Sequence, residues 1–171
     1  MTSPAPSASA ASTPQPEHTP VFDTAARRSA PHELLGLTSL AYGGDYNPEQ
    51  WDEATLAEDL ELMADAGVNL VSLGIFSWAR LEPREGTYEL DWLVELVGRL
   101  HDAGIAVDLA TATASPPAWM ATDHPESLPM NADGVRLGLG SRQQYCPSST
   151  VYRERSAALA AALAERLGDH P

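Results

Sequence analysis

From about residue 39, the chain alternates strand-like and helix-like segments three times, and this alternation restricts the fold that it can adopt. Repeated strand-plus-helix units predict a parallel sheet joined by right-handed crossovers. Three such units neither close a barrel nor cover both faces of a sheet. The chain ends at Pro171, where the pattern calls for another strand. We therefore expect it to be the front part of a larger α/β domain.

Hydrophobic periodicity and glycines place the individual elements. We expect strands at 40–44, 68–76 and 105–109. We expect helices at about 52–67, 91–104 and 149–168. Gly67 and Gly104 stand where a helix ends on a left-handed residue before a buried strand begins. The nearly continuous apolar run at 68–76 favours a parallel strand that is buried on both faces.

The connections are unequal in length, which predicts where the working surface lies. The helix-to-strand joints are tight, whereas the strand-to-helix loops at 44–51, 77–90 and 112–148 are long and rich in Trp, Pro and polar residues. In a β/α barrel, such loops lie beyond the carboxyl ends of the strands, where the active sites of that fold are found. A doubly wound open sheet is the competing architecture, but the chain has neither a G-x-G-x-x-G fingerprint nor a P-loop.

Composition narrows the choice of partners. Ten Lys and Arg against 24 Asp and Glu give a formal charge of -14, which argues against nucleic acid or an anionic membrane as a partner. An acidic, solvated surface is the simpler interpretation. No window approaches the roughly 18 apolar residues of a membrane span.

Residues 1–36 are predicted to be a separate region, a disordered tail dominated by Ala, Ser, Thr and Pro. Such a segment buries too little apolar surface to offset its ordering entropy. It lacks the basic start and apolar centre of a secretory signal, so we expect a cytoplasmic protein. The single cysteine, Cys146, rules out an intrachain disulfide and fits a reducing compartment.

The third long loop combines aromatic residues with polar donors, which is a surface chemistry that suits sugars. The ring faces of a sugar pack on indole, while its hydroxyls need fixed donors and acceptors. Trp119 in this loop and Trp78 in the second long loop are the candidate platforms. On composition alone, packing roles for these two residues are favoured over ligand binding.

Four segments occur in an order that is specific to one family. They are 42–51 (YGGDYNPEQW), 74–88 (GIFSWARLEPREGTY), 111–119 (TATASPPAW) and 140–149 (GSRQQYCPSS). Together they closely resemble the glycoside hydrolase family 42 β-galactosidases, and the resemblance covers about residues 40–171. It implies a (β/α)8 TIM barrel, with residues 37–171 as the N-terminal part of its catalytic domain, truncated before the fourth strand.

The resemblance implies the hydrolysis of terminal non-reducing β-D-galactose residues from β-D-galactosides with retention of configuration. It places a glutamate acid/base after the fourth strand and a glutamate nucleophile after the seventh, and retention needs these carboxyls about 5 to 5.5 Å apart. We expect both beyond Pro171, so the 171-residue polypeptide should be inactive. The alternative is a short product without catalysis, acting at most as a carbohydrate-binding or interaction fragment.

Two site positions follow from the resemblance. Arg142 matches an arginine that binds the galactosyl substrate, although a surface salt bridge is the alternative role. Cys146 matches the first of four cysteines that hold a structural zinc in some members, and a small buried cysteine is the alternative. The resemblance implies no required cofactor, and it implies a homo-oligomer, commonly a trimer.

Several acidic residues near strand ends could be mistaken for a catalytic pair. They are Asp45, Glu49, Glu82 and Asp108. We expect caps, turn-stabilising acceptors or partners of Arg80 or Arg84 instead, because the resemblance places the catalytic groups elsewhere. His101 is expected on an exposed helix and His124 in a loop, and no two histidines have metal-ligand spacing.

Overall fold

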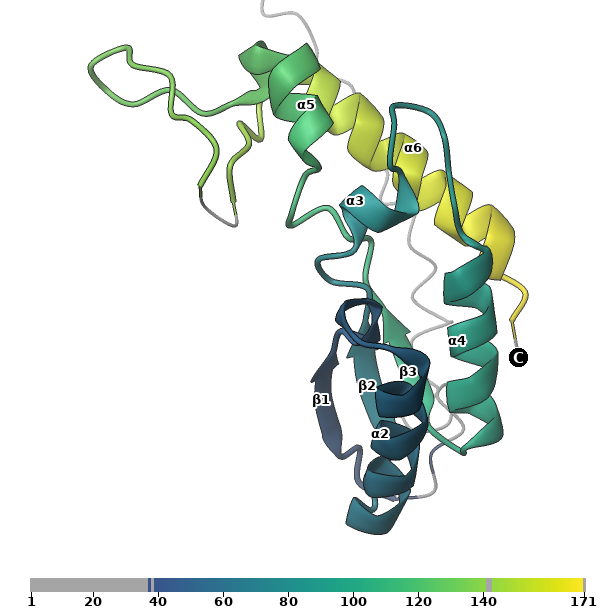
Figure 1. Ribbon diagram of the computed structural model, residues 1–171. Helices are drawn as coiled ribbons and strands as arrows, with labels where there is room; N and C mark the ends of the chain where they lie inside the picture. The colour runs from purple at the N-terminus through teal and green to yellow at the C-terminus, as the bar shows by residue number, and fades with distance from the viewer. Residues whose placement is uncertain (1–36, 38, 141–142, 171) are drawn as a thin grey trace, which may run out of the picture. The chain divides into compact units, whose positions relative to one another are not determined.

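The computed structural model describes residues 37, 39–140 and 143–170, so the predicted tail at 1–36 lies outside the described residues. Its elements alternate as the sequence predicts (Figure 1). In chain order they are β1 (Gly43–Tyr46), η2 (Pro48–Gln50), α2 (Glu53–Ala66), β2 (Leu70–Leu73), α3 (Trp78–Leu81), α4 (Asp91–Asp102), β3 (Ala106–Leu109), α5 (Ala118–Asp123), η3 (Pro125–Ser127) and α6 (Thr150–Leu167). None of the helices in this part of the chain has the length and hydropathy to cross a bilayer.

The described strands form one parallel sheet in the order β1-β2-β3, with β2 in the centre. The helix α2 connects β1 to β2, and α4 connects β2 to β3, as parallel neighbours require. One face of the sheet carries Tyr46, Val71 and Leu73, which are buried in the core with the apolar side of α4. The parallel α/β prediction is confirmed.

The helix boundaries follow from local chemistry. The Oδ1 atom of Asp52 accepts hydrogen bonds from the backbone N–H of Thr55 at 2.9 Å and from its hydroxyl at 2.8 Å, which caps α2. At the other end, Gly67 has a φ of 73°, and Gly104 after α4 has a φ of 75°. Both glycines therefore occupy the left-handed conformation that the sequence predicts.

The predicted strand boundaries are partly wrong. The predicted strand at 40–44 begins only at Gly43, because the preceding backbone is held by the side chain of Asn69, which accepts from the N–H of Tyr42 and donates to the carbonyl of Leu40. The second strand covers Leu70–Leu73 and ends where Gly74 turns with a φ of 78°. Its burial alternates instead of being complete, since only one face of the sheet is covered within the described residues.

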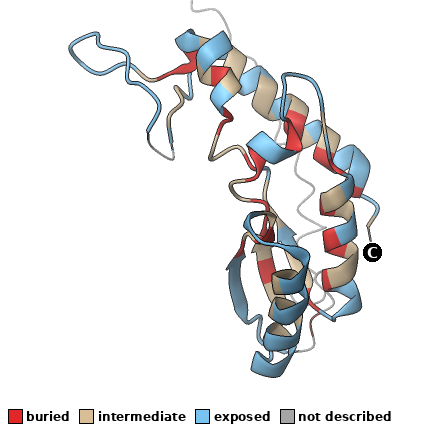
Figure 2. Ribbon diagram, viewed as in Figure 1, coloured by how far each residue is buried: buried red, intermediate tan, exposed pale blue. Residues whose placement is uncertain are grey.

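The core is built from the covered sheet face, α4, α3 and α6. Figure 2 shows buried positions along one side of α4 and of α6. The apolar stripe of α4, predicted from its spacing, is buried at Leu93, Leu96, Val97 and Leu100. Each such side chain contributes about 1.5–3 kcal/mol relative to an exposed one. From α6, the contributors are Leu159, Leu163 and Leu167.

Candidate functional site

The carboxyl ends of the three strands lie at one edge of the sheet, because the strands are parallel and in register. Tyr46, Leu73 and Leu109 end the strands, and the pairing places Tyr46 opposite Leu73 and Leu73 opposite Leu109. A long connection follows each strand, carrying η2, then α3, then α5 and η3. We call this edge, with its three connections, the carboxyl edge. The predicted placement of the long loops is confirmed.

The backbone beyond β3 is strained. Ala112 has a φ of 58°, a left-handed conformation that is uncommon for a residue with a side chain, and it is 1% exposed. Its neighbours Thr111 and Thr113 place their hydroxyl oxygens 3.0 Å apart. Strain of this kind costs about 1–3 kcal/mol and concentrates at functional sites. The exit of β3 is therefore one place where the fold holds the chain in an unfavourable shape.

A buried carboxylate organises the connection after β2. Glu82 is 0% exposed. Its Oε2 accepts from the indole N–H of Trp78 at 2.7 Å, and its Oε1 accepts from the backbone N–H of Gly86 at 2.7 Å. Within the described residues, Glu82 takes part in no ion pair. It is a turn-stabilising acceptor, as predicted, but its donors are an indole and an amide rather than Arg80 or Arg84.

Glu82 also connects two of the loops at the carboxyl edge. Its backbone carbonyl accepts from the indole N–H of Trp119, on α5, at 2.9 Å. Trp78 is 0% exposed, so it is a packing residue and not a ligand platform. Trp119 is half-buried with its N–H engaged in this hydrogen bond. The packing interpretation that the composition favours therefore holds for Trp78, and Trp119 has at least one structural role.

An aromatic stack extends this network toward the fourth family segment. The rings of Trp78 and Tyr152 have centroids 6.2 Å apart, and Tyr145 stacks on Tyr152 at 4.0 Å with an interplanar angle of 9°. The hydroxyl of Tyr152 donates to the carbonyl of Thr113 at 3.0 Å. The pKa of Tyr152 is raised, chiefly by burial and then by the hydrogen bond of Tyr152 with Tyr145. The raised pKa keeps the phenol protonated, which is the form that can donate a hydrogen bond.

Of the two predicted site residues, Arg142 and Cys146, the structure describes only Cys146. Arg142 lies outside the described residues. Cys146 is half-buried, and its backbone N–H donates to the carbonyl of Ser127 at 2.7 Å while its carbonyl accepts from Ser149. The described part of the chain contains no group of three or more His, Cys, Asp or Glu residues that could hold a metal ion. Backbone hydrogen bonds to Ser127 and Ser149 therefore hold Cys146 in place, but the described residues form no cluster of metal ligands around it.

A polar row crosses the other face of the sheet, and sequence reasoning missed it. The register pairs Asp45 with Ser72, and Ser72 with Asp108. The Ser72 hydroxyl donates to Oδ2 of Asp108 at 3.3 Å. Asp45 and Asp108 are predicted to be caps, turn-stabilising acceptors or partners of Arg80 or Arg84, but they lie within strands and point away from the helix-covered face, on the side that faces the interior of a closed barrel. The period-2 alternation of the strands is the signal that could have revealed this row.

An ionic cluster joins the second and third connections to α6. The Nε2 atom of His124 lies 3.0 Å from Oε2 of Glu85, and the Arg155 guanidinium lies 3.4 Å from the other Glu85 oxygen. The hydrogen bond to Glu85 raises the pKa of His124, and the same bond lowers the pKa of Glu85. His124 is the loop residue that the sequence predicts, between α5 and η3, and it has a specific partner.

A parallel α/β sheet whose long, aromatic loops meet at its carboxyl edge defines a segment of a β/α-barrel enzyme. Solved structures that share this arrangement include β-galactosidases. That of Rahnella sp. R3 superposes with a TM-score of 0.77 at 44% identity, covering 79% of this chain and 20% of that chain. That of Bacillus circulans sp. alkalophilus gives a TM-score of 0.74 at 43% identity, covering 76% of this chain and 19% of that chain. The fold is therefore the first three βα units of a (β/α)8 barrel.

The chain belongs to glycoside hydrolase family 42, whose family model, described as beta-galactosidase, matches residues 45–171. A β-galactosidase from Arthrobacter sp. is 56% identical over 135 residues, covering 79% of this chain and 20% of the relative. A β-galactosidase from Heyndrickxia coagulans is 55% identical over 130 residues, covering 76% of this chain and 20% of the relative. The chain spans about a fifth of the length of these relatives.

Proposed function

We propose that the protein to which these residues belong is a β-galactosidase that removes terminal non-reducing β-D-galactose from β-D-galactosides. The observation that carries the proposal is the 56% identity to a β-galactosidase over 79% of this chain. The arrangement of the carboxyl edge supports it, because three connections rich in aromatic and polar residues converge where barrel enzymes bind their substrates.

In the mechanism that we propose, the reaction is a retaining double displacement by two glutamates. One carboxyl protonates the leaving oxygen and later activates water, while the other forms the glycosyl-enzyme intermediate. We propose that both belong to the part of the family barrel that this chain does not cover. The residues described here supply the first three strands and a rigid part of the rim around the substrate.

We propose Arg142 as the substrate-binding residue of this chain. A guanidinium presents donors in a fixed fork, which suits adjacent sugar hydroxyls or a carboxylate that it orients. Described residues on both sides of it are anchored: the N–H of Gly140 donates to Oε1 of Gln144 at 2.7 Å, and Tyr145 stacks on Tyr152. This anchoring supports a fixed position for Gly140 and Gln144, which lie on the two sides of Arg142 in the sequence.

Other features of the full-length protein are proposals that rest on the family resemblance. We propose a cytoplasmic homo-oligomer, with a trimer as the expected form. A structural zinc needs four ligands, and within the described residues Cys146 lacks the partners for such a site. Zinc at Cys146 would therefore depend on ligands from elsewhere in the protein, and no step of the proposed reaction involves it.

The stereochemistry of the first product tests the proposed function. Proton NMR of the full-length protein acting on a nitrophenyl β-galactoside should show β-galactose first, with the α-anomer appearing by mutarotation. The Arg142→Ala variant should lower kcat/KM by about 10- to 150-fold, which corresponds to about 1.5–3 kcal/mol for a hydrogen bond to a charged group. The matched control is Arg153→Ala, at an exposed arginine on α6. Initial α-galactose, or equal kcat/KM in both variants, would contradict the proposal.

A further inference from the structure

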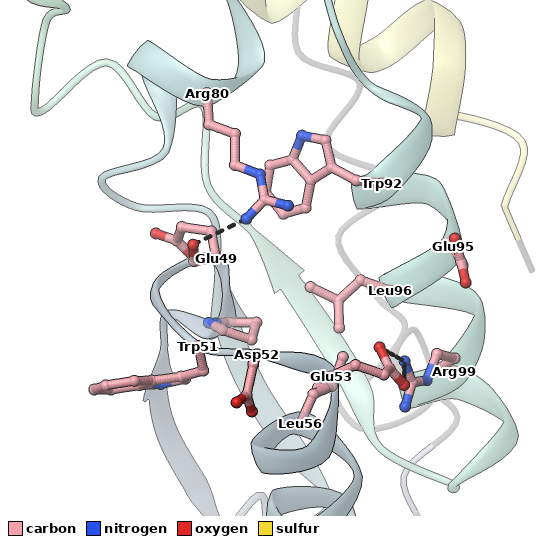
Figure 3. Close-up of a pocket in the computed structure, with 11 residues that line it drawn as sticks. Glu49, Trp51, Asp52, Glu53, Leu56, Arg80, Trp92, Glu95, Leu96 and Arg99 are labelled. Atoms are coloured by element: carbon pink, nitrogen blue, oxygen red, sulfur yellow. Dashed lines mark hydrogen bonds and ion pairs between the residues drawn. The ribbon is translucent and has the colours of Figure 1, made fainter.

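The connections at the carboxyl edge are tied to one another through backbone carbonyls. In the first connection, the carbonyl of Glu49 accepts from the guanidinium of Arg80, on α3, at 2.9 Å (Figure 3). In the second, the carbonyl of Glu82 accepts from the indole N–H of Trp119, on α5, at 2.9 Å. Each of these two connections is therefore restrained by a side chain from the next connection along the chain.

The third connection has the same kind of restraint, and it comes from α6. The carbonyl of Thr113 accepts from the hydroxyl of Tyr152 at 3.0 Å, although the two residues are 39 positions apart in the sequence. Tyr152 lies in the first turn of α6, where the hydroxyl of Ser149 accepts from its backbone N–H at 3.4 Å. The buried leucines of α6 hold that helix in the core. Tyr152 is therefore a donor in a fixed position.

The restraint on the third connection differs from the other two because it acts beside strained backbone. Ala112, next to Thr113, has a φ of 58° and is 1% exposed. A residue with a side chain keeps this left-handed conformation only where its surroundings hold it there. On one side of Ala112, the N–H of Ala110 donates to the carbonyl of Leu73 at 2.9 Å, which fixes the end of β3. On the other side, the hydrogen bond from Tyr152 fixes Thr113.

The exit of β3 belongs to the surface where the proposed function places the substrate. In β/α barrels, the active site is built on the carboxyl ends of the strands, and backbone strain concentrates at such sites. The fraction of molecules in a strained form sets the apparent affinity for any ligand that needs that form. One neutral hydrogen bond of ordinary strength changes the balance between two forms by about 2- to 12-fold.

We propose that Tyr152 is a positioning residue for the β-galactoside site. Its hydroxyl holds the exit of β3 in the strained conformation, which is the form of the third connection that binds substrate. Tyr152 acts through the backbone of Ala112 and Thr113 and does not touch the substrate. This inference rests on the proposed function, and it adds the residue that sets the shape of the third connection.

Steady-state kinetics of the full-length protein with a nitrophenyl β-galactoside test the proposal. Tyr152→Phe removes the hydroxyl but keeps the ring that stacks on Tyr145. It should raise KM by about 2- to 12-fold and leave kcat unchanged, because fewer molecules hold the binding form before the substrate arrives. A purely structural role gives the opposite result, since a loss of folded protein lowers the apparent kcat and leaves KM unchanged.

A second substitution separates backbone strain from general stability. Ala112→Gly removes the side chain that makes the left-handed conformation unfavourable, so in the Tyr152→Phe background it should return KM toward its original value. The matched control is Gly98→Ala in the same background. Gly98 lies inside α4 with no atom within 4 Å of the position that a Cβ would take. This control should stabilise the protein without changing KM.

Three results would overturn the proposal. They are an unchanged KM in Tyr152→Phe, a fall in kcat alone, and a rescue by Ala112→Gly that is absent or no larger than that by Gly98→Ala. An unaltered full-length protein without turnover would contradict the proposed function and this inference together. An active protein that gives any of the three results would contradict this inference alone.

Discussion

At the scale of single residues, Glu82 is the most consequential side chain that the structure describes. It is fully buried, and two N–H donors satisfy its two oxygens while its carbonyl holds Trp119. A buried carboxylate is costly unless donors surround it. Glu82 therefore restrains two loops of the carboxyl edge, and through Trp78 it supports the aromatic stack of Tyr152 and Tyr145.

The Glu82→Gln substitution should destabilise the folded protein. The new amide group would face either the Trp78 indole N–H or the Gly86 N–H, donor against donor, at a cost of about 1–3 kcal/mol in the free energy of unfolding. Urea-induced unfolding followed by tryptophan fluorescence measures this cost, with the exposed Glu58→Gln as the control. In a Trp78→Phe background the cost should shrink, with a coupling of about 0.5–3 kcal/mol. A cost that is equal in both backgrounds would show that the indole contact is unimportant.

The pair of His124 and Glu85 should respond to pH. The folded pKa of His124 is raised, so its contribution to stability is present below its unfolded pKa and is lost as the pH rises through the folded pKa. The folded pKa of Glu85 is lowered, so its contribution is present above its unfolded pKa and is lost as the pH falls through the folded pKa. The pair therefore stabilises the fold most between the ordinary pKa values of 4.5 and 6.5.

Proton NMR titration of His124 checks this interpretation. Glu85→Gln should lower the pKa of His124, because it removes the largest cause of the upward shift. The matched comparison is Glu126→Gln, whose carboxylate lies 3.6 Å from Nδ1 and contributes less, so the pKa should fall by a smaller amount. A larger fall in Glu126→Gln than in Glu85→Gln would reverse the assignment of the partner.

The partners of individual residues are the part of the site that the sequence predicts least well. The acceptor role of Glu82 is predicted from its place near a strand end, but charge alone suggested Arg80 or Arg84 as partners. The fold instead directs Arg80 to the Trp92 ring and the Glu49 carbonyl. Such choices depend on which loops meet in space, and single-sequence patterns do not contain that information.

At the scale of elements, the helix ends are specified by glycines whose roles differ. Gly104, with a φ of 75°, follows α4, whereas Gly98 lies inside α4. Neither has an atom within 4 Å of the position that a Cβ would take. The same substitution at both sites therefore isolates the backbone effect from any steric clash.

Alanine at these two glycines should change stability in opposite directions. Gly104→Ala forces a side chain into the left-handed region and should destabilise the protein by about 1–2 kcal/mol. Gly98→Ala should stabilise it by about 0.5–1 kcal/mol, because alanine loses less conformational freedom inside a helix. Thermal unfolding of the two variants beside the unchanged protein measures both effects. The same sign in both variants would contradict the assigned C-terminal role of Gly104.

Helices were more predictable than strands in this chain for a physical reason. A cap such as Asp52 and a terminal glycine such as Gly67 act within one turn, so the sequence contains both signals. The ends of β1 and β2 depend instead on pairing across the sheet and on Asn69, a residue far from β1 in sequence. The long third loop also contains α5 and η3, which have too few residues to show a period.

At the scale of the whole molecule, the three described strands form an open sheet and not a closed barrel. Strands β1 and β3 each pair on one side only, and the row through Ser72 faces away from the helices. Large apolar side chains are also exposed, namely Leu40, Tyr42, Trp51, Leu62, Met130, Val135, Leu137 and Leu139. Unpaired edges and exposed apolar surface both favour association.

The 171-residue chain expressed by itself should therefore associate or partly unfold. We expect apparent mass to rise with concentration in light scattering, together with binding of the dye ANS and a broad thermal transition. The full-length protein under the same conditions should bind little dye. A sharp, cooperative transition of a monomeric 171-residue chain would show that three βα units are stable without the rest of the barrel.

The barrel class and the family could be predicted because four motifs appear in order along the chain. The contacts that join those motifs could not, since the backbone carbonyl of Glu82 in the second motif accepts from the indole N–H of Trp119 in the third, which no single-sequence pattern indicates. Arg142 remains a prediction, because it lies outside the described residues.

One assay tests the proposal that both catalytic glutamates lie in the part of the barrel that this chain does not cover. It measures the release of nitrophenol from a nitrophenyl β-galactoside by the 171-residue chain and by the full-length protein. The full-length protein should turn over substrate. The 171-residue chain should release none, because both glutamates are assigned to the part of the barrel that it does not cover. Measurable turnover by the 171-residue chain that survives Arg142→Ala would contradict both the location of the catalytic groups and the role of Arg142.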